Sequence, residues 1–114
     1  MRDYTLYLKD ILAAIDRIEE FVAGMELEAF QTDDKTSSAV LRKLEIIGEA
    51  AKQIPDEMRQ QHTGIPWKEM AGMRDKLIHS YFGVDYPLVW ETIKKRLPNV
   101  AEEIREILKG PSKL

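Results

Sequence analysis

The sequence predicts an all-α fold, an antiparallel bundle of four to five helices, and three observations support this. Apolar residues recur at alternating steps of three and four over long stretches, which is the spacing of one helix face. Glycine and proline separate these stretches, and the separating segments are short. No stretch alternates apolar and polar residues as a half-buried strand does. With 114 residues, we expect a single domain over residues 1–114.

The first helix is predicted over about residues 3–23, with Gly24 as its end. Its apolar face consists of Tyr4, Leu8, Ile11, Ile15, Ile18 and Val22. The segment that follows, residues 26–35, is polar, and we expect it to be turn-like.

The second helix is predicted to begin with Thr36, Ser37 or Ser38 as its cap and to end before Pro55, since the residue before a proline disfavours helical geometry. Its apolar face consists of Val40, Leu44, Ile47, Ala51 and Ile54. Gly48 lies within this helix and would allow a neighbouring element to approach closely.

The next segments are a short helical turn over residues 56–62 and a loop over residues 63–66. A third helix is predicted over residues 67–80, with Pro66 at its first position, where the missing N–H costs nothing.

Gly83 and Asp85 mark a turn before the last helix, with Asp85 as its N-cap and Pro87 in its first turn. Pro98 lies inside this helix and should kink or break it just before the proline, because proline removes one backbone hydrogen bond and clashes with the preceding turn. The apolar face consists of Val89, Ile93, Leu97, Val100, Ile104 and Leu108.

The composition, 44% hydrophobic and 32% charged residues, is that of a globular chain. There is no cysteine, which excludes disulfides and thiolate metal sites. The net charge of −3 excludes a uniformly basic nucleic-acid-binding surface, so any RNA contact must come from a local patch. The first residues are amphipathic and unlike a signal peptide, and no stretch reaches the ~18 apolar residues of a membrane span. We therefore expect a cytoplasmic protein that does not associate with a membrane.

Arg74 is the most unusual residue of the third helix. On a helical projection it lies about 40° from Met70, inside an apolar arc, where a guanidinium group needs a partner. A structural salt bridge, or a side chain that extends out to solvent, is the simpler explanation. On a straight helix His79 lies about 140° from Arg74, so the two do not share a face. Asp75, one turn before His79, could orient the imidazole.

Arg74 and His79 also form a motif: four residues separate them, and one more residue separates His79 from Tyr81. Other stretches around this motif match those of a known family in the same order. They are residues 47–51, residues 65–67, residues 81–85 followed by Val89 and Trp90, and Leu97-Pro98. With these motifs, roughly residues 2–108 resemble the HepT-like toxins of the HEPN superfamily.

The resemblance implies a homodimeric HEPN-like bundle in which Arg74 and His79 of both copies line a cleft at the dimer interface. It implies an endoribonuclease toxin of a toxin–antitoxin pair that needs neither a metal nor a cofactor. The RNA substrate would be, for example, transfer RNA or messenger RNA. The implied partner is a minimal nucleotidyltransferase antitoxin, which silences the toxin by adding AMP to the motif tyrosine, here Tyr81.

This chemistry suits the residues. RNA is cut when its 2′-hydroxyl attacks the adjacent phosphate, and a neutral His79 could take that proton. Arg74 could stabilise the transition state through bidentate hydrogen bonds. A two-fold interface can bring Arg74 of one chain toward His79 of the other. AMP on Tyr81 would block an RNA phosphate by charge and volume, whereas without the resemblance Tyr81 is an ordinary packing residue.

Three further features are weaker candidates. Glu49 matches the family's glutamate, and we keep it with Asp75 as a supporting residue. Glu45 and Glu49 lie one turn apart, but no histidine completes the Glu-x-x-His units of a carboxylate-bridged metal site, and a solvated face or an intersubunit salt bridge explains them better. The candidate RNA contacts are a short basic run, Lys94, Lys95 and Arg96, which could bind RNA phosphates. Such runs on helices are more often simply exposed to solvent.

Two functions remain open. The intact set of Arg74, His79 and Tyr81 favours the ribonuclease toxin. The net negative charge favours the alternative, a non-catalytic HEPN dimer that acts as a binding partner or substrate of a nucleotidyltransferase. A plain structural bundle would leave Arg74 on the apolar face unexplained.

Overall fold

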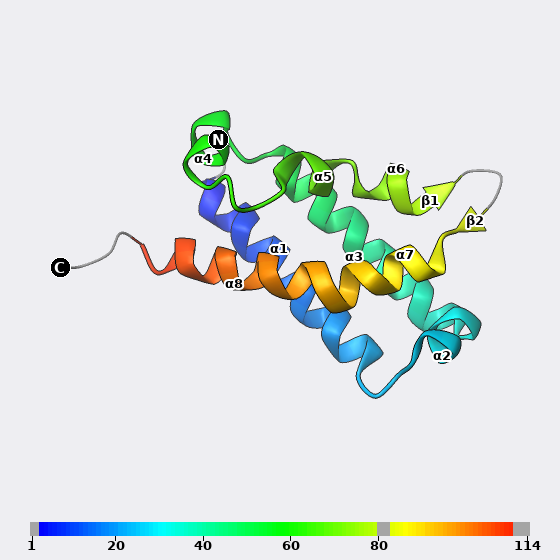
Figure 1. Cartoon of the computed structure of the whole chain (residues 1–114). Helices are drawn as coiled ribbons and strands as arrows, with labels where there is room; N and C mark the ends of the chain where they lie inside the picture. Colours follow the sequence, from blue (N-terminus) through cyan, green and yellow to red (C-terminus); the bar gives the residue numbers. More distant parts are fainter. Residues whose placement is uncertain (1–2, 80–82, 111–114) are drawn as a thin grey trace.

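The computed structural model describes residues 3–79 and 83–110, and the predicted all-α class is confirmed there. The helix α1 (Tyr4–Val22) packs along α3 (Asp34–Lys52), which returns in the opposite direction, and α8 (Leu97–Leu108) packs against α1 (Figure 1). Shorter helices join these three, namely α2 (Leu27–Thr32), α4 (Asp56–Gln61), α5 (Trp67–Ala71), α6 (Met73–Leu77) and α7 (Tyr86–Glu91). No helix among the described residues is long and apolar enough to cross a bilayer.

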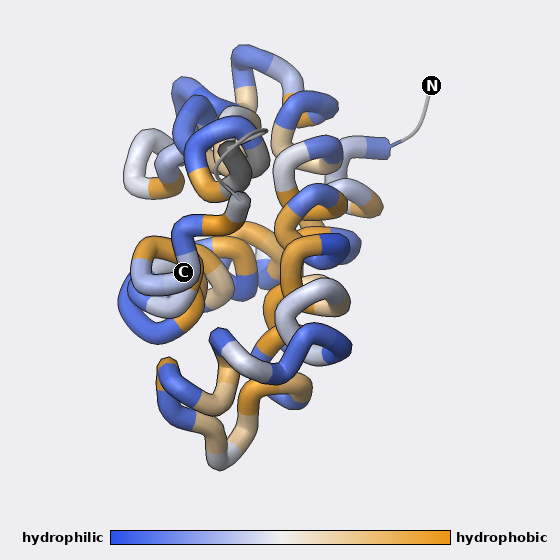
Figure 2. The backbone as a smooth tube through the Cα atoms, turned by 90° about the vertical axis from the view of Figure 1, so that its right-hand side faces the viewer, coloured by the Kyte–Doolittle hydropathy of each residue, from blue (hydrophilic) through white to orange (hydrophobic). Residues whose placement is uncertain are grey.

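The core lies where the apolar faces of the long helices meet, and Figure 2 shows hydrophobic stretches (orange) recurring along these helices. The predicted face of α3 is buried throughout, as is that of α1 except for Tyr4, which is exposed at the start of the helix. The predicted face of the last helix is buried up to Ile104, and Leu108 is half-buried. Helical periodicity therefore predicted the core correctly, and the error falls at a helix end, where neighbouring elements stop.

The prediction of a polar turn over residues 26–35 is wrong. This stretch contains α2, whose Phe30 is fully buried. The Phe30 ring lies edge-on to Tyr86, with centroids 6.0 Å apart, and at 5.2 Å from the ring of Trp90. A six-residue helix anchored by one aromatic side chain has too few apolar positions to produce a periodic signal, so the contact with α7 reveals what the local pattern could not.

The cap of α3 is Asp33, not Thr36, Ser37 or Ser38 as predicted. The Asp33 carboxylate accepts hydrogen bonds from the Thr36 amide at 2.9 Å and from its hydroxyl at 2.8 Å. Thr36 is thus a donor to the cap, and α3 begins two residues earlier than the first cap candidate.

The Asp33 cap makes a testable contribution to stability. The hydrogen bond from the Thr36 amide holds the pKa of Asp33 below its ordinary value of 3.8. Because the folded pKa is the lower one, the contribution is fully present above that ordinary value and is lost as the pH falls through the folded pKa. We expect Asp33→Ala to lower the melting temperature near neutral pH and to have a smaller effect in acid.

Circular dichroism melts of wild type and variant at neutral and acidic pH would measure this. Asp33→Asn is the matched control, since asparagine caps a helix without a titrating charge, and it should keep most of the stability at neutral pH. An equal loss for Asp33→Ala at both pH values would contradict the role of the ionised cap.

The end of α3 has a cap that sequence patterns did not indicate. The helix stops at Lys52, before the predicted end next to Pro55. The Arg59 guanidinium donates hydrogen bonds to the carbonyl oxygens of Ala51 at 2.9 Å, Ile54 at 3.0 Å and Lys52 at 3.3 Å. A cation at a helix C-terminus satisfies free carbonyl groups and interacts favourably with the helix dipole. Arg59, from the predicted short helix α4, therefore fastens α4 to the end of α3.

The predicted third helix over residues 67–80 is also wrong in its extent. It divides at Gly72 into α5 and α6, and the chain is extended in β1 (Ile78–His79). The strand β1 pairs antiparallel with β2 (Gly83–Val84), with Ile78 opposite Val84 and His79 opposite Gly83. Gly72 is a poor helix former, and Gly83 has a φ of 82°, which favours glycine. Such short strands leave no alternating pattern in the sequence.

The last helix confirms two predictions. Asp85 caps α7 by accepting a hydrogen bond from the Leu88 amide at 3.1 Å. The break before Pro98 takes the form of a π-helical turn, η1 (Thr92–Arg96), in which the Leu97 amide donates to the Thr92 carbonyl. Proline lacks the N–H that an α-helix would need and its ring clashes with the preceding turn, and a π-helical turn is one known form of the resulting kink. The buried Thr92 hydroxyl donates to the Leu88 carbonyl at 2.8 Å.

Candidate functional site

The motif lies where the helical path of the chain ends. Arg74 belongs to α6, whereas His79 belongs to β1, so the predicted angle of about 140° on one helix is wrong. An extended residue follows no helical projection, because successive side chains of a strand point to opposite faces. The side chains of Arg74 and His79, and the whole of Tyr81, lie outside the part of the chain that the structure describes.

The helix α5, which leads into the motif segment (residues 74–81), is held against α3 by a close backbone contact. A Cβ atom on Gly48 would lie 3.2 Å from the backbone oxygen of Met70 and 3.6 Å from that of Ala71, so α5 approaches α3 where α3 has no side chain. The predicted role of Gly48 is confirmed. At the start of α5, the buried Trp67 donates from its indole N–H to the His62 carbonyl at 3.0 Å. These two contacts fix α5, and α6 continues directly from it.

Gly48→Val is expected to destabilise the protein by about 1–3 kcal/mol, the usual cost of overpacking. The added side chain would meet backbone atoms of α5, which cannot move aside as a flexible side chain can. Urea unfolding followed by circular dichroism would measure the change. At an open helix position, replacing glycine with alanine stabilises by roughly 0.5–1 kcal/mol, so Gly48→Ala serves as the comparison and should show little of that gain. A Gly48→Val protein as stable as wild type would contradict the close approach.

The structure brings the two supporting residues together. Glu49 of α3 and Asp75 of α6 line one surface hollow, with Glu45 and Lys52 also on its wall. We call it the acidic hollow. The Lys52 ammonium lies 3.5 Å from the Glu49 carboxylate, and both side chains are largely exposed, so this ion pair contributes little to stability. Among the side chains that the structure describes, those on the side of α6 that faces α3 are therefore mainly acidic.

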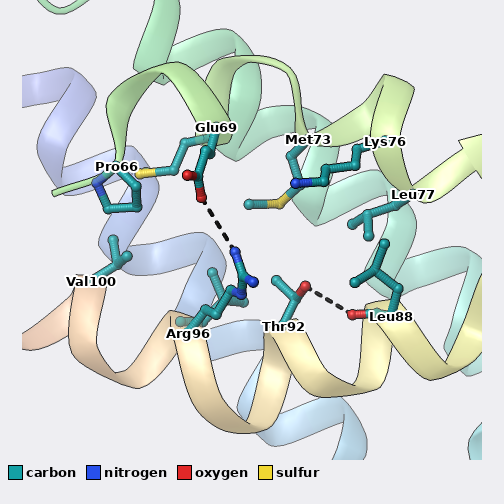
Figure 3. Close-up of a pocket in the computed structure, with 11 residues that line it drawn as sticks. Pro66, Glu69, Met73, Lys76, Leu77, Leu88, Thr92, Arg96 and Val100 are labelled. Atoms are coloured by element: carbon teal, nitrogen blue, oxygen red, sulfur yellow. Dashed lines mark hydrogen bonds and ion pairs between the residues drawn. The ribbon is translucent and has the colours of Figure 1, made fainter.

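The other side of α6 borders a hollow of different character, between α5–α6 and η1 (Figure 3). We call it the η1 hollow. Its cavity volume is about 40 Å³, and its walls include the apolar side chains of Met70, Met73, Leu77 and Leu97. Its polar rim consists of Glu69, Lys76 and Arg96.

Two of the three candidate RNA contacts in the basic run have partners within the chain. All three side chains are exposed. The Arg96 guanidinium lies 3.2 Å from the Glu69 carboxylate across the rim of the η1 hollow (Figure 3). The Lys94 ammonium lies 4.9 Å from the centre of a Trp90 ring. Of the three, Arg96 lines the η1 hollow beside α6, the helix that carries Arg74. Sequence reasoning missed Glu69, because Glu69 and Arg96 belong to different helices and no local pattern connects them.

An all-α bundle that carries the Arg-x₄-His motif at the end of a short helix defines a class, the HEPN-type proteins. Residues 11–107 match the model of the family described as "Ribonuclease HepT-like". The chain therefore belongs to the HepT-like family, a ribonuclease family of the HEPN superfamily.

Similar proteins agree with this membership. The chain is 49% identical over 108 residues to "Probable ribonuclease HepT" of Thermococcus cleftensis, covering 95% of this chain and 98% of that protein. It is 50% identical over 102 residues to "Putative RNase TTE0752" of Caldanaerobacter subterraneus subsp. tengcongensis, covering 90% and 91%. It is 50% identical over 108 residues to "Putative RNase MJ1216" of Methanocaldococcus jannaschii, covering 95% and 89%. No solved structure matches the chain.

Proposed function

We propose that this protein is a metal-independent endoribonuclease toxin that cuts RNA with Arg74 and His79. The observation that carries the proposal is the intact motif of Arg74, His79 and Tyr81 in a chain of the HepT-like ribonuclease family. The alternative, a non-catalytic dimer that only engages a nucleotidyltransferase, would not require both an arginine and a histidine in this motif.

The proposed reaction is cleavage by the RNA's own 2′-hydroxyl. His79 takes the proton of that hydroxyl, whose oxygen then attacks the adjacent phosphorus. The bond from phosphorus to the 5′ oxygen breaks, and that oxygen takes a proton from water. Arg74 donates hydrogen bonds to the phosphate oxygens while charge develops on them. The products are a 2′,3′-cyclic phosphate and a 5′-hydroxyl.

We further propose that two copies form the working site and that a minimal nucleotidyltransferase is the antitoxin. In a two-fold dimer, two motif segments would border one cleft, so that Arg74 of one copy can act with His79 of the other. Transfer of AMP to the Tyr81 hydroxyl would place an anionic phosphodiester and a nucleoside two residues from His79, where they would compete with an RNA phosphate. The resemblance to the HepT-like toxins is the basis for both statements.

The test of the nuclease is incubation of purified protein with total RNA and with transfer RNA in EDTA. We expect fragments that end in a 2′,3′-cyclic phosphate. Light scattering after size exclusion would measure the dimer. The absence of cleavage, with a folded and unmodified protein, would favour the non-catalytic alternative.

The test of silencing uses ATP and a purified minimal nucleotidyltransferase. We expect the mass of the chain to rise by one AMP unit at Tyr81 and the cleavage to stop. Tyr81→Phe should stay unmodified and active under the same conditions. Modification at a different tyrosine would refute the assignment of Tyr81.

A further inference from the structure

The two sides of α6 differ in charge, and this difference bears on where an RNA strand can run. On the α3 side, the described side chains that line the acidic hollow include Glu45, Glu49 and Asp75, together with Lys52. On the η1 side, Lys76 and Arg96 stand on the rim of the η1 hollow, and the Glu69 carboxylate is paired with Arg96 (Figure 3). RNA carries a negative charge at every phosphate, so Lys76 and Arg96 attract a strand that crosses the motif toward the η1 side.

We propose that the η1 hollow is a subsite for one RNA nucleotide, in which Arg96 binds a phosphate in place of Glu69 and the apolar wall receives the base. This subsite deepens the proposed ribonuclease function and rests on it. It adds Lys76 and the apolar wall to the residues that contact RNA, and it makes Glu69 the group that the RNA phosphate displaces.

The Glu69–Arg96 ion pair is suited to such an exchange. Its side chains are 58% and 50% exposed, so solvent screens the attraction and the pair is weak. A phosphate carries the same charge as a carboxylate and accepts paired hydrogen bonds from a guanidinium group. Lys76, from the motif helix itself, supplies a second cation on the same rim. In free protein Glu69 therefore occupies the position that an RNA phosphate would take.

The wall of the hollow is suited to a base. Met70 and Met73 present thioether groups, which are polarisable and make favourable contacts with aromatic rings. Leu77 and Leu97 complete an apolar surface at the same place. The present volume of about 40 Å³ admits only the edge of a ring. The rim side chains are exposed, however, so they can swing outward when Arg96 exchanges its partner.

The test measures binding without cleavage. The probe is a short fluorescent 2′-O-methyl RNA of mixed sequence, which cannot be cut through its 2′ oxygen, and its affinity is measured by anisotropy with the full chain. We expect Glu69→Gln to bind this probe about two- to fivefold more tightly, because Arg96 is freed from a weak pair. We expect Arg96→Gln to weaken binding and to lower the salt dependence by about one phosphate contact.

The chain offers a matched control. Arg105 and Asp16 form an ion pair of similar length, 3.3 Å, and similar exposure, 51% and 52%. Asp16→Asn removes the same charge as Glu69→Gln, away from the hollow, and should leave the affinity unchanged. In an Arg96→Gln background, Glu69→Gln should no longer tighten binding. If Glu69→Gln binds no more tightly than Asp16→Asn, the exchange at Arg96 is refuted.

A second comparison tests the base. Leu88→Phe fills the hollow from its edge, and we expect it to weaken binding of the probe several-fold while leaving an abasic oligonucleotide of the same length unaffected. Equal weakening for both probes, or none for either, would overturn the base subsite. Urea unfolding would verify that the variant folds. Since none of these measurements requires cleavage, a protein that binds as expected but does not cut RNA would refute the proposed function and leave the subsite standing.

Discussion

His79→Ala is expected to lower the rate of RNA cleavage by about 10²–10⁴-fold, the usual contribution of a general base. The imidazole is the only group of the motif that can both accept and donate a proton near neutral pH. Initial rates on transfer RNA in EDTA, with equal amounts of folded protein, would measure the loss.

The sequence supplies a matched control, since the chain has two histidines. His62 follows α4, and its backbone carbonyl, which a side-chain change leaves in place, accepts the hydrogen bond from Trp67. His62→Ala should therefore cut RNA at close to the wild-type rate. Equal rates for wild type, His62→Ala and His79→Ala would indicate a contaminating nuclease and would remove His79 from the mechanism. Arg74→Lys should be impaired as well, because lysine keeps the charge but cannot form the bidentate contact.

Phe30→Ala is expected to destabilise the protein by about 3–5 kcal/mol, the usual cost of removing a buried aromatic side chain. Phe30 is fully buried and joins α2 to α7 through Tyr86 and Trp90, so its removal leaves a cavity between elements that are far apart in the sequence. Urea unfolding followed by circular dichroism would give the change in the free energy of unfolding.

Phe21 is the control for this prediction. It is 36% exposed on α1, so Phe21→Ala removes the same side chain while sacrificing less buried surface. We expect its destabilisation to be clearly smaller than that of Phe30→Ala. Similar losses for the two variants would mean that α2 does not depend on its aromatic anchor.

The elements that could be predicted are those whose signal is local and repeated. The apolar faces of α1, α3 and the last helix each extend over several turns, so their burial followed from spacing alone. The Asp85 cap and the break before Pro98 also followed from local rules, since a cap and a proline act within one turn. The motif of Arg74, His79 and Tyr81 was visible for the same reason, because it is contiguous.

The elements that could not be predicted depend on distant partners. The helix α2 is anchored by Phe30 against Tyr86 and Trp90 of α7, and the end of α3 is capped by Arg59 from the next helix. The departure of His79 from the helix depends on its pairing with Gly83, which a helical projection cannot represent. The ion pair between Glu69 and Arg96 joins residues that only folding brings together.

The sequence by itself determined the all-α class, the buried faces of the long helices, the family and the residues of the motif. Each of these follows from the spacing or identity of residues that lie near one another in the sequence. The tertiary structure alone decided that α6 separates the acidic hollow from the apolar η1 hollow, whose rim carries Lys76 and Arg96, and that Glu69 forms an ion pair with Arg96. The physical reason is that electrostatic attraction and hydrophobic packing act between residues that are close in space, however far apart they are in the sequence. Their effect at the motif therefore depends on which helices pack beside it.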